Sequence, residues 1–139
     1  MTVMTKIIHV ESKGESDITD ITREVERVVG ESGVQNGIVA LFVQGSTGAL
    51  TTAEYEDGLI KDLSKALERL APKNVVYEHE KRWHDGNGHS HVKASIVGSS
   101  LVVPFTERRL TLGAWQQIVF IELDTKSRSR DLVVQIVGE

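Results

Sequence analysis

The chain has 139 residues, enough for one ordinary domain with a buried core and too few for a second domain of typical size. Sixteen basic and twenty acidic residues give a formal charge of -4 and a pI near 5.7, without any long basic run, so nucleic acid is not expected as a partner. The absence of cysteine excludes disulfides, thiolate-bound zinc and thiol nucleophiles, and leaves histidine, carboxylate and backbone oxygen as metal ligands.

The chain reads as one continuous fold. No Pro-, Gly- or Ser-rich stretch is long enough to act as a linker, so residues 1–139 are expected to form a single domain. Residues 1–16 lack a charged lead followed by an apolar stretch, and no window approaches the roughly 18 apolar residues of a membrane helix. These features predict a soluble cytoplasmic protein with no membrane partner.

The first elements in chain order are predicted to be a strand and a helix. Residues 3–10 have the composition of a strand. Apolar residues then recur at spacings of three and four from Ile18 to Val28, which places them on one helix face. Asp17 or Asp20 is expected to cap the start of this helix.

The middle of the chain is predicted to hold a buried strand, a helix and another strand. Residues 37–44 form an almost unbroken apolar, β-branched run, typical of a strand covered on both faces or lying at a subunit contact. From Tyr55, leucine and alanine recur at helical spacing on an otherwise charged segment that ends at Pro72. Residues 74–79 are predicted to form a strand.

The last part of the chain is predicted to be mostly strand. Residues 99–105 form one strand, and residues 115–124 and 131–138 are expected to pair as a hairpin. The polar turn of that hairpin carries Arg128 and Arg130, both expected to be solvated. Because strands outnumber helices and connections are short, an α+β fold is predicted, with a mostly antiparallel sheet packed with two to three helices.

Four of the five histidines fall within 13 residues: His79, His84, His89 and His91. Neutral imidazole is a common ligand of zinc, and three nitrogens that leave one position open are typical of catalytic zinc. His84, His89 and His91 are therefore predicted to hold a divalent metal, with zinc expected first. If this segment is a strand, His89 and His91 would lie on the same face. If it is a helix that ends at Gly98 and includes His91, His89 is expected to precede the helix, so the two rings could still converge.

Two other interpretations of the histidine run stay open. Clustered histidines can act as acid, base and phosphate donor without any metal, since imidazole carries protons as readily as it binds ions. A polar run of this kind can also be an ordinary surface loop. Asp85 is expected to be a fourth ligand or to fix the tautomer of one imidazole.

Further candidate residues lie outside the histidine run. Glu54 could be a general base or a ligand, or could simply complement the dipole of the helix that begins near it. Ser46 and Thr47 belong to a turn that could hold an anion through N–H groups and hydroxyls, although it matches no phosphate-loop motif. Arg108 could bind an anionic substrate or occupy a turn, and Trp115 is expected in the core.

Three segments together resemble one known family, the YjbQ-like proteins, some of which are described as secondary thiamine-phosphate synthases. The segments are DGNGHSHVKASIVGSSLVVPF, LTLGAWQQIVFIELD and RSRDLVVQIVGE. The resemblance covers nearly the whole chain. It implies an α+β fold with a sheet curved around helices, a homotrimer, and a polar cluster near the subunit boundary that sometimes holds a metal.

Carried over by residue, the resemblance assigns the polar site to His84, Asp85, Asn87, His89 and His91, with Glu54 and Gln116 as neighbours. The chain departs from the family pattern at three places. Gln44 begins the Gly45-Ser46-Thr47 turn where many members have histidine, Ala53 stands where many have asparagine, and Arg108 replaces glycine. These departures are expected to affect activity more than fold.

Two classes of function follow from these residues. In the first, a metal or a protonated histidine neutralises charge on a small phosphorylated substrate while another imidazole or Glu54 moves a proton. Thiamine-phosphate synthesis is the reaction that the resemblance implies, and hydrolysis of a small phosphate ester is an equally simple expectation. In the second class, a trimer binds a metal or small ligand without turnover.

Overall fold

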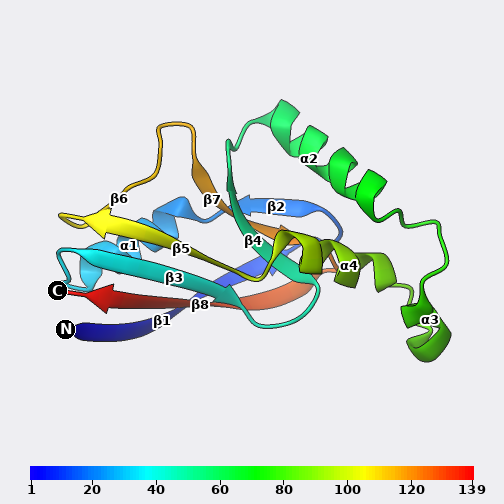
Figure 1. Ribbon diagram of the computed structural model, residues 1–139, viewed down its shortest axis with the longest axis horizontal. Helices are drawn as coiled ribbons and strands as arrows, with labels where there is room; N and C mark the ends of the chain where they lie inside the picture. The colour runs from blue at the N-terminus through cyan, green and yellow to red at the C-terminus, as the bar shows by residue number, and fades with distance from the viewer.

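Eight strands and four helices make up the computed structural model, which describes residues 1–139 (Figure 1). The strands are β1 (Thr2–Ser12), β2 (Asp17–Asp20), β3 (Gly37–Val43), β4 (Gly48–Ala53), β5 (Ser100–Thr106), β6 (Arg109–Leu110), β7 (Gln117–Glu122) and β8 (Arg128–Gly138). The helices are α1 (Thr22–Glu31), α2 (Asp57–Leu70), α3 (Glu78–Trp83) and α4 (Gly88–Val97).

The strands form two sheets, and every pairing is antiparallel. The larger sheet has the order β1-β8-β3-β5-β6, and the smaller one the order β2-β7-β4. A core cluster of 18 buried apolar residues lies between the two sheets and α1, and includes Val25, Leu41 and Phe120. The other face of the smaller sheet packs against α2 and α4 through a second cluster that includes Leu67 and Ala94. The predicted α+β class is confirmed, with four helices rather than two or three.

Strand β3 shows how the sequence determines which face is buried. Successive side chains of a strand point to opposite faces, so Val39 and Leu41 enter the core while Ile38 and Phe42 are exposed on the outer face. The prediction of a strand over residues 37–44 is confirmed. Within the chain this strand is covered on one face only.

The predicted hairpin between the last two strands is wrong. β7 pairs with β2 and β4 in the smaller sheet, whereas β8 pairs with β1 and β3 in the larger one. The burial patterns give the physical reason: five of the six residues of β7 are buried, since its sheet is covered on both faces, while β8 alternates between buried and more exposed positions. A short polar connection can join strands of different sheets as easily as neighbours in one sheet.

Three local predictions also fail. Asp17 and Asp20, expected to cap a helix that includes Ile18, lie in β2, and α1 begins only at Thr22. Residues 74–79 form no strand; they lead into α3, and Val76 is 82% exposed because no strand edge lies beside it. Residues 48–53, for which no element was predicted, form β4. Trp115 is 76% exposed rather than part of the core. None of the helices combines the length and the apolar character that crossing a bilayer requires.

Candidate functional site

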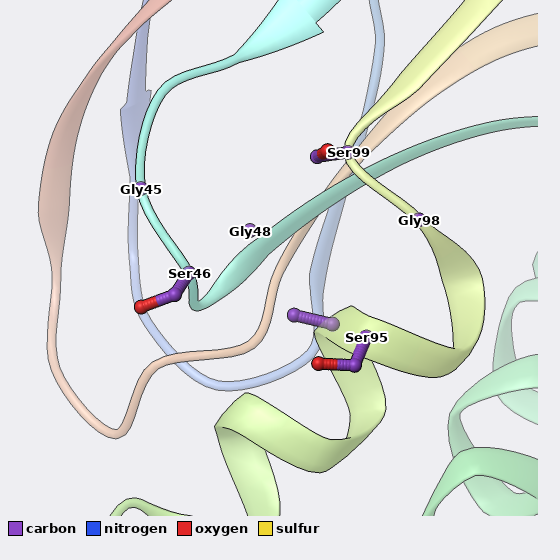
Figure 2. A pocket seen from close by; sticks show the side chains of 7 residues that line it. Gly45, Ser46, Gly48, Ser95, Gly98 and Ser99 are labelled. Atoms are coloured by element: carbon purple, nitrogen blue, oxygen red, sulfur yellow. The ribbon is translucent and has the colours of Figure 1, made fainter.

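A polar cavity of about 220 Å³ lies where the β3–β4 turn, the start of α4 and the β7–β8 connection meet. None of its lining residues is hydrophobic; they are Gly45, Ser46, Thr47, Asn87, His91, Asp124, Arg128 and Arg130. A second cavity of about 270 Å³ shares Gly45 and Ser46 with it and extends toward the C-terminal end of α4 (Figure 2). We name the first the polar cavity and the second the serine cavity.

The β3–β4 turn brings unused hydrogen-bond donors to the polar cavity. The backbone N–H groups of Gly45, Ser46 and Thr47 have no hydrogen-bond partner within the chain. Gly45 has a φ of +117°, a conformation that favours glycine, and a Cβ at this position would lie 3.0 Å from Nη1 of Arg130. Glycine therefore permits the turn and leaves space beside the guanidinium group.

Arg130 is a buried cation with one unused nitrogen. Its residue exposure is only 7%. Nε donates to Oε1 of Glu122 at 2.8 Å, and Nη2 donates to the second oxygen of the same carboxylate and to Oγ1 of Thr47. Hydrogen bonding to Glu122, against the effect of burial, raises the pKa of Arg130. Nη1 has no hydrogen-bond partner within the chain and lies beside Gly45.

Asp124 and Arg128 form the second ion pair of the cavity. The Asp124 side chain is 1% exposed and accepts hydrogen bonds from Arg128, from Oγ1 of Thr47 at 3.1 Å and from the Thr125 N–H at 2.7 Å. Burial opposes ionisation, but the hydrogen bonds from Thr125 and Arg128 outweigh it and lower the pKa of Asp124 to about 2. Asp124 is therefore a fixed carboxylate rather than a proton donor.

The pKa of Asp124 predicts a loss of stability in acid. A fall from 3.8 to about 2 corresponds to roughly 2 kcal/mol of folding free energy, which is present above pH 3.8 and lost as the pH falls through about 2. Asp124→Asn is expected to lower the free energy of unfolding by about 2 kcal/mol at pH 7 and to flatten its dependence on acid pH. Urea unfolding across this range tests both, with exposed Asp62→Asn as the control. Equal acid sensitivity in all three proteins would contradict the assignment.

His91 is the titratable side chain of the polar cavity that forms no hydrogen bond within the chain. Its ring lies against that of His79, with 4.4 Å between the centroids and 37° between the planes. Partial burial, followed by repulsion from His79, lowers the pKa of His91. Nδ1 of His79 lies 3.3 Å from Oδ1 of Asp85, without forming a hydrogen bond of good geometry. A neutral imidazole with unused nitrogens can accept a proton from a ligand.

A family model described as UPF0047 protein YjbQ-like matches residues 6–139. The chain belongs to the YjbQ-like UPF0047 family. A UPF0047 protein of Archaeoglobus fulgidus is 40% identical over 86% of this chain and 90% of its own length. UPF0047 protein YugU of Bacillus subtilis is 33% identical over 97% of this chain and all of its own. A solved structure from Sulfolobus solfataricus P2, a YbjQ-like protein of unknown function, has a TM-score of 0.92, 34% identity and 99% coverage of both chains.

The predicted zinc ligands of this YjbQ-like protein do not come together within the chain. α4 begins at Gly88, so His89 and His91 are both helical and, two positions apart, point in nearly opposite directions. His89 is 1% exposed and its Nε2 lies 2.6 Å from Oε1 of Glu15, while His84 is exposed at the end of α3. No group of three or more His, Cys, Asp or Glu side chains is arranged to hold a metal.

Three other predicted residues of the YjbQ-like chain lie outside the polar cavity. Glu54 lines a separate cavity beside Trp115, and the cap of α2 is Glu56 rather than Glu54. Gln116 bonds to Oγ1 of Thr52 and the Gly113 N–H. Arg108 lies at the β5–β6 turn and donates its N–H to the carbonyl of Gln35 at 2.9 Å.

Four predicted residues do meet at the polar cavity. They are Ser46, Thr47, Asn87 and His91. Asp85 does not line the cavity, but its Oδ1 accepts a hydrogen bond at 2.8 Å from the amide nitrogen of Asn87. The expectation that Arg130 is solvated is wrong. The sequence did indicate its burial. Every second side chain of a strand points to the same face, and Arg130 shares its face of β8 with the buried Leu132 and Val134.

The two buried carboxylates, Glu122 and Asp124, were missed as well. Glu122 continues an apolar run whose residues are covered on both faces, so a charge there requires a buried partner. The residue that neutralises it follows eight positions later, as Arg130. His79 belonged to the histidine cluster but was given no role.

Proposed function

We propose that this YjbQ-like protein is an enzyme that acts on small phosphorylated molecules, with the phosphate in the polar cavity and His91 as the proton carrier. The observation that carries the proposal is a set of unused donors at one place: the N–H groups of the Gly45–Thr47 turn and Nη1 of Arg130. Phosphate oxygens accept hydrogen bonds from guanidinium groups and from consecutive backbone N–H groups. The guanidinium of Arg130 is held in place by Glu122 and leaves Nη1 open to the cavity, so it suits such a ligand.

Recognition would depend on the direction of donors more than on net charge. Glu122 neutralises Arg130, and Asp124 neutralises Arg128, so the two pairs together carry no formal charge. Arg128 uses Nε and Nη2 for Asp124 and is 40% exposed, which leaves its Nη1 available to a ligand. A phosphate fits this arrangement because each of its oxygens can accept several hydrogen bonds.

His91 would supply the proton transfer. Its lowered pKa favours the neutral ring, which accepts a proton from an attacking hydroxyl or water. In the transfer that the resemblance implies, a pyrimidine-methyl diphosphate joins a thiazole phosphate and pyrophosphate leaves. In hydrolysis, water attacks phosphorus and gives its proton to the His91 imidazole, the P–O bond to the alcohol breaks, and the imidazolium returns that proton to the departing oxygen. Both reactions use the same anion-binding turn.

Zinc has no fitting ligand set within this chain, because the environments of His84, His89 and His91 diverge. The proposed steps therefore use only side chains and backbone groups of the polar cavity. Zinc binding stays a prediction that metal analysis of the purified protein tests. The cytoplasmic location and the lack of nucleic-acid and membrane partners also stay predictions.

Gly45→Ala tests the proposed phosphate site. The added Cβ would be strained at a φ of +117° and would lie 3.0 Å from Nη1 of Arg130, so phosphate affinity and turnover are expected to fall at least about tenfold. Inorganic phosphate binding, followed by ³¹P NMR, is measured beside thiamine-phosphate formation and phosphate-ester hydrolysis.

Gly33→Ala is the matched control for this experiment. Gly33 also has a positive φ, of +77°, but a Cβ there meets nothing within 4 Å and the residue lines no described cavity of the site. It should lose a similar amount of stability and keep phosphate binding. Unchanged phosphate affinity in Gly45→Ala would overturn the proposed site, and binding without any turnover of phosphorylated compounds would favour the non-catalytic alternative.

We propose in addition that the chain assembles as a homotrimer, as the resemblance implies. The outer face of the larger sheet supports assembly, because Ile7, Phe42 and Val102 are each about half exposed there, at 55%, 47% and 56%. Ile7 and Phe42 both lie opposite Val133 of β8, so apolar side chains continue across three strands. Contiguous exposed apolar patches of this kind mark interaction surfaces.

A charge on that face is expected to break the assembly. Phe42→Asp should shift the mass in solution from three chains to one, since an unpaired carboxylate would be buried at the contact. Light scattering after size exclusion measures the mass. Val76→Asp, at an 82% exposed position before α3, is the control and should leave the mass unchanged. Phe42→Asp with the wild-type mass would show that this face is not the contact.

A further inference from the structure

We propose that the organic part of the substrate is a compact, hydroxyl-rich and non-aromatic group, such as a polyol or a sugar, bound in the serine cavity. This inference rests on the proposed function, which supplies the phosphate anchor, and of its two reactions it favours hydrolysis of a polyol or sugar phosphate over the transfer that joins a pyrimidine to a thiazole, because both of those rings are aromatic. It concerns the part of the ligand beyond the phosphate, and it follows from the composition and connection of the two cavities.

The two cavities form one cleft with two lobes. Gly45 and Ser46 line both, so a ligand whose phosphate is held at the β3–β4 turn has the serine cavity directly beside it. Figure 2 shows the turn with Gly45, Ser46 and Gly48 across from the end of α4, where Ser95 and Gly98 lie; the Ser95 hydroxyl points toward the turn and the Ser46 hydroxyl points away from α4. The buried Arg130, with Nη1 unused beside Gly45, is the independent sign that a ligand belongs at this junction.

The serine cavity offers hydrogen-bonding groups and is lined by no large apolar side chain. Its lining consists of glycines, serines and one alanine, Ala94, without a charged or aromatic side chain. The hydroxyls of Ser46 and Ser99 have no hydrogen-bond partner within the chain. The Ser95 hydroxyl donates to the carbonyl of His91 at 2.8 Å, which leaves its oxygen able to accept a hydrogen bond from a ligand.

Aromatic ligands would find little to bind in this lobe. Pockets for aromatic rings gain most of their affinity from apolar and aromatic contacts. No aromatic side chain lines the lobe. Phe120 lies behind Gly48, where a Cβ would be 2.9 Å from its ring, but it is fully buried. With a volume of about 270 Å³, the lobe also lies below the range of about 300 to 1,000 Å³ typical of drug-sized ligands.

Two phosphate monoesters of similar size test the inference: glycerol 3-phosphate, which has two free hydroxyls, and phenyl phosphate, which has an aromatic ring. Dissociation constants are measured by calorimetry for both compounds and for inorganic phosphate. Glycerol 3-phosphate is expected to bind at least about tenfold more tightly than phenyl phosphate, which corresponds to one or two extra hydrogen bonds.

Ser99→Ala makes the test specific to the serine cavity. It should weaken glycerol 3-phosphate about three- to tenfold and leave phenyl phosphate and inorganic phosphate unchanged. Ser127→Ala, an exposed serine outside the cleft, is the matched control. If inorganic phosphate binds but phenyl phosphate binds as tightly as glycerol 3-phosphate, this inference is overturned while the proposed function stands. If inorganic phosphate itself fails to bind, both are overturned.

Discussion

Glu122→Ala is expected to lower the free energy of unfolding by about 3 to 5 kcal/mol, the largest effect of any single substitution considered for this chain. The Glu122 side chain is fully buried and holds the guanidinium of Arg130, which is itself only 8% exposed. Removal of the carboxylate would leave a buried cation without its counter-ion, and the Ser12 hydroxyl would keep only the longer of its two acceptors, the Arg128 carbonyl at 3.2 Å. Urea unfolding at pH 7 measures the change.

Two controls separate the loss of the pair from a general loss of packing. The double variant Glu122→Leu with Arg130→Met removes both charges and should recover most of the stability, because apolar replacements of a buried pair are often neutral. Glu78→Ala breaks an exposed pair with Lys81 and should cost less than about 1 kcal/mol. A loss in Glu122→Ala no larger than that in Glu78→Ala would contradict the buried pair.

His91→Ala is expected to reduce turnover of a phosphorylated substrate by about 10² to 10⁴-fold while the protein stays folded. Its ring lines the polar cavity with both nitrogens unused, and no other imidazole lines that cavity. His84→Ala, at an exposed position, is the control and should keep full activity. Steady-state kinetics together with circular dichroism distinguish lost chemistry from lost structure. Equal losses in the two variants would exclude a special role for His91.

The pH dependence of the reaction adds a second measure of His91. A base with a lowered pKa is neutral at neutral pH and becomes protonated only below the ordinary value of 6.5, so kcat/KM is expected to fall as the pH drops through a pKa below 6.5. His79→Ala removes the neighbouring ring and its repulsion, which should move this acidic limb to higher pH. An unchanged profile would show that His79 does not tune His91.

Local sequence patterns predicted where several helices and strands lie, but they did not predict which strands pair with one another. The short, β-branched apolar run of residues 37–44 and the spacing of three and four after Tyr55 are local signals of a strand and a helix, so β3 and α2 were predictable. The partners of β7 and β8 were not, because pairing depends on which faces other segments cover. Residues 74–79 show the same limit: their composition suits a strand, but no sheet edge lies beside them.

The candidate site was predictable where neighbours in sequence stay neighbours in space. Ser46 and Thr47 were correctly grouped, since a short turn holds them together. His89 and His91 were expected to converge on one ion. Both lie in α4, however, where side chains two positions apart point in nearly opposite directions. Arg130 lies on β8, far from the β3–β4 turn in the sequence, and only the long-range pairing of β8 with β3 brings it to the site.

The position of β8 between β1 and β3 determines when the polar cavity can form during synthesis. Residues 128–138 join the two strands made earliest in the larger sheet, so that sheet cannot close until they have left the ribosome. Arg130 belongs to this same strand and contacts the β3–β4 turn through Thr47. Nascent chains that stop short of β8 would therefore lack the polar cavity, and a ligand bound there could not guide the early steps of folding.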